Sequence, residues 1–149
     1  MMTQAAFIED ILEASSEIVI TPEFMRAFEL IEHSNSNVFL TGKAGTGKST
    51  FLTYFRENTQ KQIAVIAPTG VAALNVQGQT IHSMFRFAPR FLDMGTIKPD
   101  RRKIFKELNL LIIDEISMVR ADVFDGINKF LQLARKNDEP FGGVQICVI

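Results

Sequence analysis

This sequence has little cysteine, no tryptophan and no long apolar run. One cysteine in 149 residues excludes a fold held by disulfides and agrees with a reducing cytosol. No segment reaches the roughly 18 apolar residues that a membrane helix needs. The start of the chain, with Glu9 and Asp10 close behind Phe7 and Ile8, lacks the basic flank of a signal peptide. We therefore expect a cytoplasmic protein with no membrane segment.

Neither sign of charge is in excess. Sixteen Lys and Arg stand against 17 Asp and Glu, for a net charge of −1, so any binding of nucleic acid must depend on a local surface. Hydrophobic residues make up 46% of the chain, which suits one compact domain with a full core. Cys147 and His33 offer no metal-binding cluster, so the only metal expected is Mg²⁺ on a nucleotide.

The most informative feature is the stretch Gly42–Ser49, which fits GxxxxGK[ST], the loop that cradles nucleotide phosphates. An apolar run at 38–40 predicts a short buried strand before it, and a helical pattern follows from about Lys48. Glycines allow the positive φ that turns backbone N–H groups toward phosphate oxygens. Lys48 would meet the β- and γ-phosphates of ATP, and the Ser49 hydroxyl would ligate Mg²⁺. The predicted nucleotide-binding residues are Gly42, Ala44, Gly45, Thr46, Gly47, Lys48, Ser49 and Thr50.

Three more apolar runs, at 63–66, 110–113 and 144–149, are short, continuous and largely β-branched. Strands covered on both faces look like this. Helical patterns lie between them, at 71–76 and 121–136. Strands that alternate with helices predict a three-layer α/β domain with a mostly parallel sheet.

The amino-terminal part predicts two helices. Thr3 could cap the first, and Thr21-Pro22-Glu23 supplies a capping hydroxyl, a proline at the first helical position and an acid in the first turn of the second. We take residues 1–20 as a leader and 21–149 as one ATPase domain. Residues 86–99 hold Pro89, Gly95 and Pro99 and are expected to be the least regular part.

An acidic pair, Asp114 and Glu115, directly follows the apolar run at 110–113. Ligands of α/β sheets bind at the carboxyl ends of the strands. One carboxylate could hold Mg²⁺, and the neighbouring acid could orient and deprotonate the attacking water. We predict Ser49 and Asp114 as metal ligands, and Lys48 and Glu115 as catalytic residues.

Three strings carry a family resemblance: Ala67-Pro68-Thr69-Gly70-Val71-Ala72-Ala73-Leu74, Thr80-Ile81-His82-Ser83-Met84-Phe85 and Asp114-Glu115-Ile116-Ser117-Met118-Val119. In this order they resemble motifs of the Pif-type DNA helicases, relatives of the RecD subunit within helicase superfamily one. The resemblance runs from about Thr21 to the last residue. It implies the first of two RecA-like domains of a motor that hydrolyses ATP, moves five-prime to three-prime on single-stranded DNA and unwinds duplex DNA.

The resemblance also assigns residues. Lys48, Ser49, Asp114 and Glu115 match the family's phosphate, Mg²⁺ and water-activating residues. Pro68, Thr69 and Gly70 match a motif that touches the DNA backbone, and His82, Ser83 and Phe85 fall in a second such motif. The implied partners are single-stranded DNA and duplex or structured DNA, and we expect a monomer near the nucleoid that serves DNA repair, recombination and telomere maintenance.

The sequence departs from the family pattern in three places. Phe24–Phe28 holds no counterpart of the glutamine with which family members often contact adenine, and Gln77-Gly78 replaces a double glycine. The chain ends within the fourth predicted core strand, before the γ-phosphate sensor and the arginine fingers that the resemblance implies. The 149 residues alone are therefore expected to hydrolyse ATP poorly.

Several of these residues also have plain structural interpretations. Thr69 could simply cap a helix, His82 could be a structural histidine, and Phe85 and Phe87 could be core residues instead of platforms for bases. The basic cluster Lys98, Arg101, Arg102, Lys103 and Lys106 could be a solvated helix face or a phosphate-contacting patch.

Other classes of P-loop protein remain as alternatives. A GTPase needs an acid in an NKxD motif, which 128–131 lacks, and a kinase needs an arginine-bearing lid, which nothing after Glu115 supplies. A module that binds ATP without hydrolysing it is a further alternative. Strand order separates these classes. In a RecA-like domain 144–149 should be a central parallel strand between 38–41 and 110–113, with Cys147 buried, whereas direct pairing of the outer two would indicate a kinase or GTPase.

Overall fold

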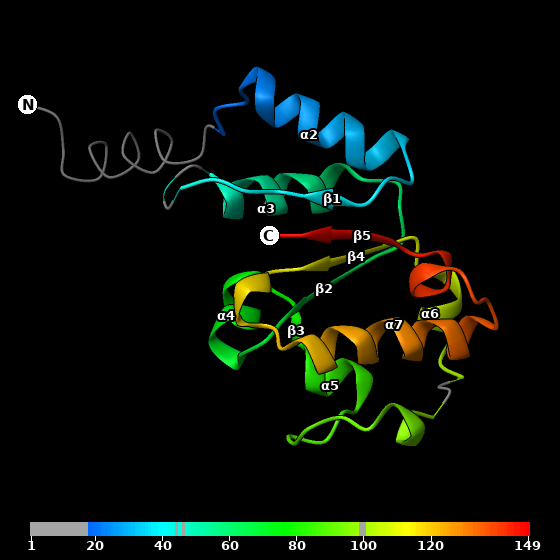
Figure 1. Cartoon of the computed structure of the whole chain (residues 1–149). Coiled ribbons are helices and arrows are strands. Elements are labelled where there is room, and N and C mark those ends of the chain that lie inside the picture. The colour runs from blue at the N-terminus through cyan, green and yellow to red at the C-terminus, as the bar shows by residue number, and fades with distance from the viewer. Residues whose placement is uncertain (1–17, 44, 46, 99–100) are drawn as a thin grey trace, which may run out of the picture.

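One five-stranded sheet forms the centre of the fold. A computed structural model describes residues 18–43, 45, 47–98 and 101–149 (Figure 1). The strand order is β1-β5-β4-β2-β3, and all the neighbouring pairs are parallel. The strands are β1 (Val38–Phe39), β2 (Ile63–Ala67), β3 (Gln79–Thr80), β4 (Leu110–Ile113) and β5 (Gln145–Val148).

Helices cover both faces of the sheet, which gives the predicted three layers. The helices α2 and α3 lie over one face of the sheet, and α5, α6 and α7 lie over the other (Figure 1). Their buried side chains form two separate apolar clusters, one on each face. The predicted helix that Thr3 would cap lies outside the described residues. The described helices are α2 (Pro22–His33), α3 (Lys48–Asn58), α4 (Gly70–Asn75), α5 (Ile81–Phe85), α6 (Lys103–Glu107) and α7 (Ala121–Arg135), with 3₁₀ turns at η1 (Met94–Thr96), η2 (Ile116–Met118) and η3 (Pro140–Gly143).

The strand β4 shows why a strand at the centre of the sheet has a continuous apolar sequence. Leu110 and Ile112 belong to the cluster under α2 and α3, while Leu111 and Ile113 belong to the cluster under α7. All four side chains are at most 1% exposed. Because successive side chains of a strand point to opposite faces, a strand covered on both sides must be apolar at every position.

The terminal run forms a central strand, as predicted. In β5, Cys147 is paired with Val38 of β1 on one side and with Ile112 of β4 on the other. Cys147 is 1% exposed. Since β5 separates β4 from β1, the direct pairing that would have indicated a kinase or GTPase does not occur.

Burial of Cys147 gives a first testable prediction. Desolvation raises the pKa of its thiol to about 12, so the reactive thiolate is scarce at pH 8. We expect iodoacetamide to leave the folded chain unmodified at pH 8 and to add one label after denaturation, measured by mass spectrometry. Fast labelling without denaturant would mean that β5 does not stay within the sheet.

The helix α2 begins as its sequence predicts. Pro22 occupies the first helical position, and the Thr21 hydroxyl accepts a hydrogen bond from the Phe24 backbone N–H at 3.2 Å. The rings of Phe24 and Phe28 then pack edge-on or tilted against aromatic rings of α3, with centroids 5.0–5.7 Å apart. This contact aligns α2 along α3, the helix that begins at the phosphate loop.

A lysine at the opposite end of α2 fixes that helix to the sheet. The Lys61 ammonium donates to the carbonyl oxygens of Ile31 at 2.6 Å and Ser34 at 2.7 Å, and to the side-chain oxygen of Gln145 at 2.6 Å. Burial lowers the pKa of Lys61, and the charge of Glu32 opposes that shift. The three bonds satisfy all three ammonium donors and place a cation at the carboxyl end of the helix dipole.

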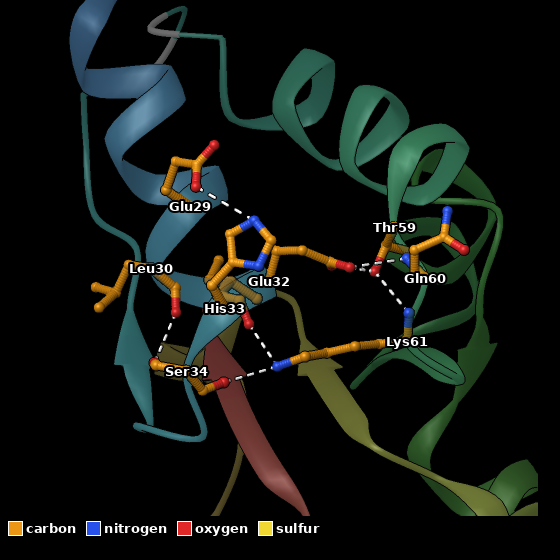
Figure 2. Close-up of polar contacts among 9 residues, drawn as sticks. Glu29, Leu30, Glu32, His33, Ser34, Thr59, Gln60 and Lys61 are labelled. Atoms are coloured by element: carbon orange, nitrogen blue, oxygen red, sulfur yellow. Dashed lines mark hydrogen bonds and ion pairs between the residues drawn. The ribbon is translucent and has the colours of Figure 1, made fainter.

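The Glu32 carboxylate completes this anchor. It accepts a hydrogen bond from the Thr59 hydroxyl at 2.5 Å and another from the Gln60 backbone N–H at 2.9 Å. Figure 2 shows Lys61 reaching under α2 while Glu32 points toward the end of α3. The end of α2 is therefore tied to the α3–β2 connection and to β5.

A few elements were not predicted from the sequence or were predicted with shifted bounds. The two-residue strand β3 was not predicted, because such a short segment carries no periodicity. The helix predicted over 71–76 spans Gly70–Asn75, a shift of one residue. The helix predicted over 121–136 spans Ala121–Arg135, and its apolar stripe of Val123, Ile127, Phe130, Leu131 and Ala134 lies in the core. Residues 86–98 contain only the η1 turn as regular structure.

Candidate nucleotide site and DNA-facing edge

The phosphate loop connects β1 to α3, and its glycines adopt the backbone that the motif requires. Gly45 has φ +78° and Gly47 has φ +87°, a region that side chains disfavour. Gly47 caps α3, and its carbonyl accepts the hydrogen bond of the Phe51 backbone N–H at 2.8 Å. The predicted binding residues Ala44 and Thr46 lie outside the described residues.

Lys48 points back into this loop. Its ammonium donates to the carbonyl oxygen of Gly42 and, at 3.3 Å, to that of Lys43. The ammonium therefore lies against the backbone of the loop, where a phosphate oxygen could replace these carbonyl oxygens as its partner. An ammonium in this position favours a ligand with several closely spaced negative charges.

The acidic pair emerges from β4 at the carboxyl edge of the sheet. The Asp114 backbone N–H donates to the carbonyl of Ile66 at 2.9 Å, so β2 fixes the start of this turn. Partial burial raises the pKa of Asp114, and the neighbouring Glu115 charge adds to the rise, while a backbone hydrogen bond from Glu115 and the charge of Lys48 lower it. Glu115 has φ +53°, an uncommon backbone for this residue type.

One hollow brings the two motifs together. It has a volume of about 330 Å³, and its walls include Lys48 and Ser49 from the phosphate loop, Asp114 and Glu115 from the acidic turn, and Thr69 from the start of α4. The strand β5 lies between β1 and β4, so two strand spacings, about 10 Å, separate the loop from the acids. That space suits terminal phosphates, a metal ion and a water molecule.

A second hollow of about 700 Å³ opens on the other side of the phosphate loop. It is lined by Gly42, Gly47 and Lys48 of the loop region, by Thr21, which caps α2, and by Phe24 within α2. The sequence analysis placed the family's adenine contact in the stretch 24–28 but did not assign Thr21 or Phe24 to the site.

Comparison with known proteins identifies the family to which this chain belongs. The family model for PIF1-like helicases matches residues 20–149. The chain belongs to that family. The yeast ATP-dependent DNA helicase RRM3 of Saccharomyces cerevisiae is 39% identical over 144 residues, covering 89% of this chain, and ATP-dependent DNA helicase Pif1 of Psychrobacter sp. is 38% identical over 125 residues, covering 77%. The chain spans about a fifth of the length of these relatives, 20% and 19%.

Solved Pif1 structures share the fold. A crystal structure of Bacteroides Pif1 bound to ssDNA superposes with a TM-score of 0.79 at 40% identity, and one of Bacteroides Pif1 in complex with ADP-AlF4 with 0.78 at 41%. Each match covers 89% of this chain and 32% of the other. The domain is therefore a RecA-like domain of the Pif1 type, as predicted.

The two segments predicted to face DNA leave the sheet side by side. Ala67 at the end of β2 is paired with Thr80 at the end of β3, so the residues after them share one edge. Thr69 caps α4 by accepting from the Ala72 N–H at 3.2 Å, which confirms the capping role. Thr69, Gly70 and Ser83 are exposed at this edge, and Pro68 and His82 are half-buried.

The structure gives Phe85 a different role from the predicted one. Its side chain is 2% exposed and packs against the rings of Phe87, Phe105 and Phe130, with centroids 5.0–5.6 Å apart. A ring enclosed this way cannot stack on a base in this arrangement. We therefore assign Phe85 to the core, the alternative that the 13 phenylalanines of the chain already favoured, since most of them must be buried.

The residues of the basic cluster do not all have the same surroundings. The Arg102 guanidinium donates to the carbonyl of Met84 at 2.6 Å and lies 4.8 Å from the Phe105 ring centroid. It therefore packs against the protein, although a solvated helix face was one expectation for this cluster. Lys98 and Arg101 line a hollow of about 710 Å³ whose other walls include Arg86, Arg90, Asp93, Phe87 and Phe91. The arginine and phenylalanine alternation of 86–91 was the unused signal for this basic hollow.

Among the described residues, no group of three or more His, Cys, Asp or Glu is placed to hold a metal ion. No helix within this part of the chain is long and apolar enough to cross a membrane.

Proposed function

We propose that residues 21–149 are the first motor domain of an ATP-dependent DNA helicase, which moves five-prime to three-prime on single-stranded DNA. The observation that carries this proposal is the hollow that joins Lys48 and Ser49 to Asp114 and Glu115. The matched relatives are named ATP-dependent DNA helicases, which supports the assignment. Residues 1–20 would be a leader.

Four residues of the hollow have a proposed task in ATP hydrolysis. Lys48 balances the charge of the β- and γ-phosphates, and Ser49 and Asp114 hold Mg²⁺. A hydroxyl and a carboxylate are hard oxygen ligands of the kind that Mg²⁺ prefers, so these two residues would suit it. Glu115 orients the attacking water and takes its proton. The ionised form of Asp114 is the one that binds the metal.

The DNA-facing edge lies next to this site. Thr69, Gly70 and Ser83 present hydroxyl and backbone groups, which contact phosphates without reading the base sequence. Pro68 and His82 would contribute to the same surface. Since Thr69 also lines the nucleotide hollow, a change at the γ-phosphate has a short path to the DNA. A second motor domain would supply the arginine finger, which is worth about 10³–10⁵ in rate.

Substitution of Lys48 tests the nucleotide site. We expect Lys48→Ala to weaken binding of Mg-ATP at least tenfold in calorimetry, because the loop loses the cation that faces the terminal phosphates. Lys43→Ala is the matched control, since it removes the same charge from an exposed position of the same loop. Equal affinities of wild type and Lys48→Ala, with equal circular dichroism, would refute the site.

A further inference from the structure

The two segments of the DNA-facing edge are joined through a short connection between α4 and β3. The first segment, 68–70, leads into α4, and the second, which includes Ser83, follows β3. Residues 76–78 form the α4–β3 connection. The helix α4 has only 6 residues, and a helix that short is not stable by itself. The placement of both segments therefore depends on what holds the α4–β3 connection.

Arg56 of α3 binds this connection. One guanidinium nitrogen donates to the carbonyl oxygen of Gln77 at 2.9 Å, and another donates to that of Val76 at 2.6 Å. The last carbonyl groups of a helix have no partner within the helix. The planar guanidinium of an arginine can bind two such oxygens at once through charge-assisted hydrogen bonds. These two bonds join α3, the helix that begins at the phosphate loop, to the end of α4.

The backbone of the connection needs this support. Gln77 has φ +50°, in the left-handed region that residues other than glycine seldom adopt. A Cβ atom at the next residue, Gly78, would lie 2.4 Å from the carbonyl oxygen of Val65, so the chain cannot relax toward β2. An uncommon backbone conformation persists only where its surroundings fix it. Here β2 limits the connection on one side, and Arg56 holds it from α3.

The position of the connection is passed on to the DNA-facing edge at both of its ends. Beyond it, Thr80 of β3 is paired with Ala67 of β2, and the Thr80 hydroxyl accepts a hydrogen bond from the Ser83 backbone N–H at 3.1 Å. Before it, α4 begins at the residue that Thr69 caps. A shift of the connection would therefore displace Ser83 on one side and Thr69 on the other.

We propose that Arg56 is a positioning residue for DNA binding, which holds the α4–β3 connection against α3 and so keeps both DNA-facing segments in one arrangement before DNA binds. The inference rests on the proposed function, which places DNA at this edge. Arg56 does not itself contact DNA, because its half-buried guanidinium is engaged with carbonyl oxygens. A surface arranged in advance binds more tightly, since less conformational freedom is lost on binding.

The test measures how tightly the 149-residue chain binds a fluorescent single-stranded oligothymidine, by anisotropy. We expect Arg56→Met to raise the Kd for this oligonucleotide at least fivefold. The Kd for Mg-ATP in calorimetry should stay within threefold, because Lys48 and Ser49 are unchanged. Arg26→Met is the matched control, since Arg26 is an exposed arginine of α2, and it should change the Kd for the oligonucleotide less than twofold.

Two further measurements separate positioning from direct contact with DNA and from a general loss of stability. Removal of a phosphate contact would lower the salt dependence, the slope of log Kd against log salt concentration, by about 0.7, whereas we expect an unchanged slope. Gln77→Gly added to Arg56→Met should return the Kd to within twofold of the wild type, because glycine adopts a positive φ without strain. Arg56→Lys keeps the charge but not the planar fork, and it should raise the Kd at least twofold.

Thermal melting shows which variants are folded, and Arg56→Lys replaces Arg56→Met in the comparison if the latter has no cooperative transition. Weaker DNA binding with an unchanged salt slope, recovered by Gln77→Gly, supports the inference. An unchanged Kd in the folded Arg56 variant overturns it, and so does a slope lowered by a whole phosphate contact or a lack of recovery. Failure of the wild type to bind the oligonucleotide would instead contradict the proposed DNA-facing edge, and the inference would fall with it.

Discussion

Removal of residues 144–149 is expected to prevent the chain from folding. The strand β5 pairs with β1 on one side and β4 on the other, so its loss leaves both without their shared neighbour. Val144, Ile146 and Cys147 are at most 3% exposed. Burial of a large apolar side chain contributes about 1.5–3 kcal/mol, and a domain is stable by only about 5–15 kcal/mol. The truncated chain should lack a cooperative melting transition in circular dichroism.

A pair of point substitutions tests the same prediction without truncation. Ile146→Asp places a charge in the core under α7, and we expect it to abolish cooperative melting because a buried unpaired carboxylate is costly. Phe39→Asp is the matched control, since Phe39 lies in the edge strand β1 and is 65% exposed. A cooperative transition near the wild-type temperature in both Ile146→Asp and the truncated chain would show that β5 is not a core strand.

Glu115→Gln is expected to lower ATP hydrolysis by about 10²–10⁴-fold while binding of Mg-ATP persists. The amide has nearly the shape of the carboxylate, but it cannot take a proton from the attacking water. Lys48 and Asp114, which are proposed to hold the phosphates and the metal, are unchanged, so the affinity should stay within a few-fold. Hydrolysis is followed as release of labelled phosphate under single-turnover conditions, which detect a slow reaction.

Glu107→Gln is the control for this substitution. Glu107 ends α6, is exposed, and forms a surface ion pair with Lys103 at 3.2 Å, which contributes little to stability. We expect it to hydrolyse ATP like the wild type. Hydrolysis by Glu115→Gln at the wild-type rate would exclude Glu115 as the base.

Local sequence patterns were sufficient to predict the long helices. The capping hydroxyl, proline and acid at 21–23 placed the start of α2, and the apolar spacing of 123–134 placed the buried face of α7. Both signals are local, because a helix contacts itself every three to four residues. Short elements lack that repetition, so β3 was missed.

Part of the site could be predicted because its motifs are also local in the sequence. The phosphate loop and the acidic turn are contiguous strings whose spacing determines their local geometry. The anchor of α2 could not be predicted, because Lys61, Ile31 and Gln145 are far apart in the sequence. Nor could the positive φ of Glu115, which the turn after β4 imposes on a residue type that seldom adopts it.

The sequence by itself determined the phosphate loop, the acidic pair, the α/β class and the family resemblance, because each depends on neighbouring residues or on one repeated period. Only the tertiary structure decided that Phe85 belongs to the core, that Arg102 packs on Phe105, and that Phe24 lines the second hollow beside the phosphate loop. Those outcomes depend on which side chains meet across helices distant in the chain. The residue type alone does not show whether an aromatic ring or a guanidinium is buried or exposed.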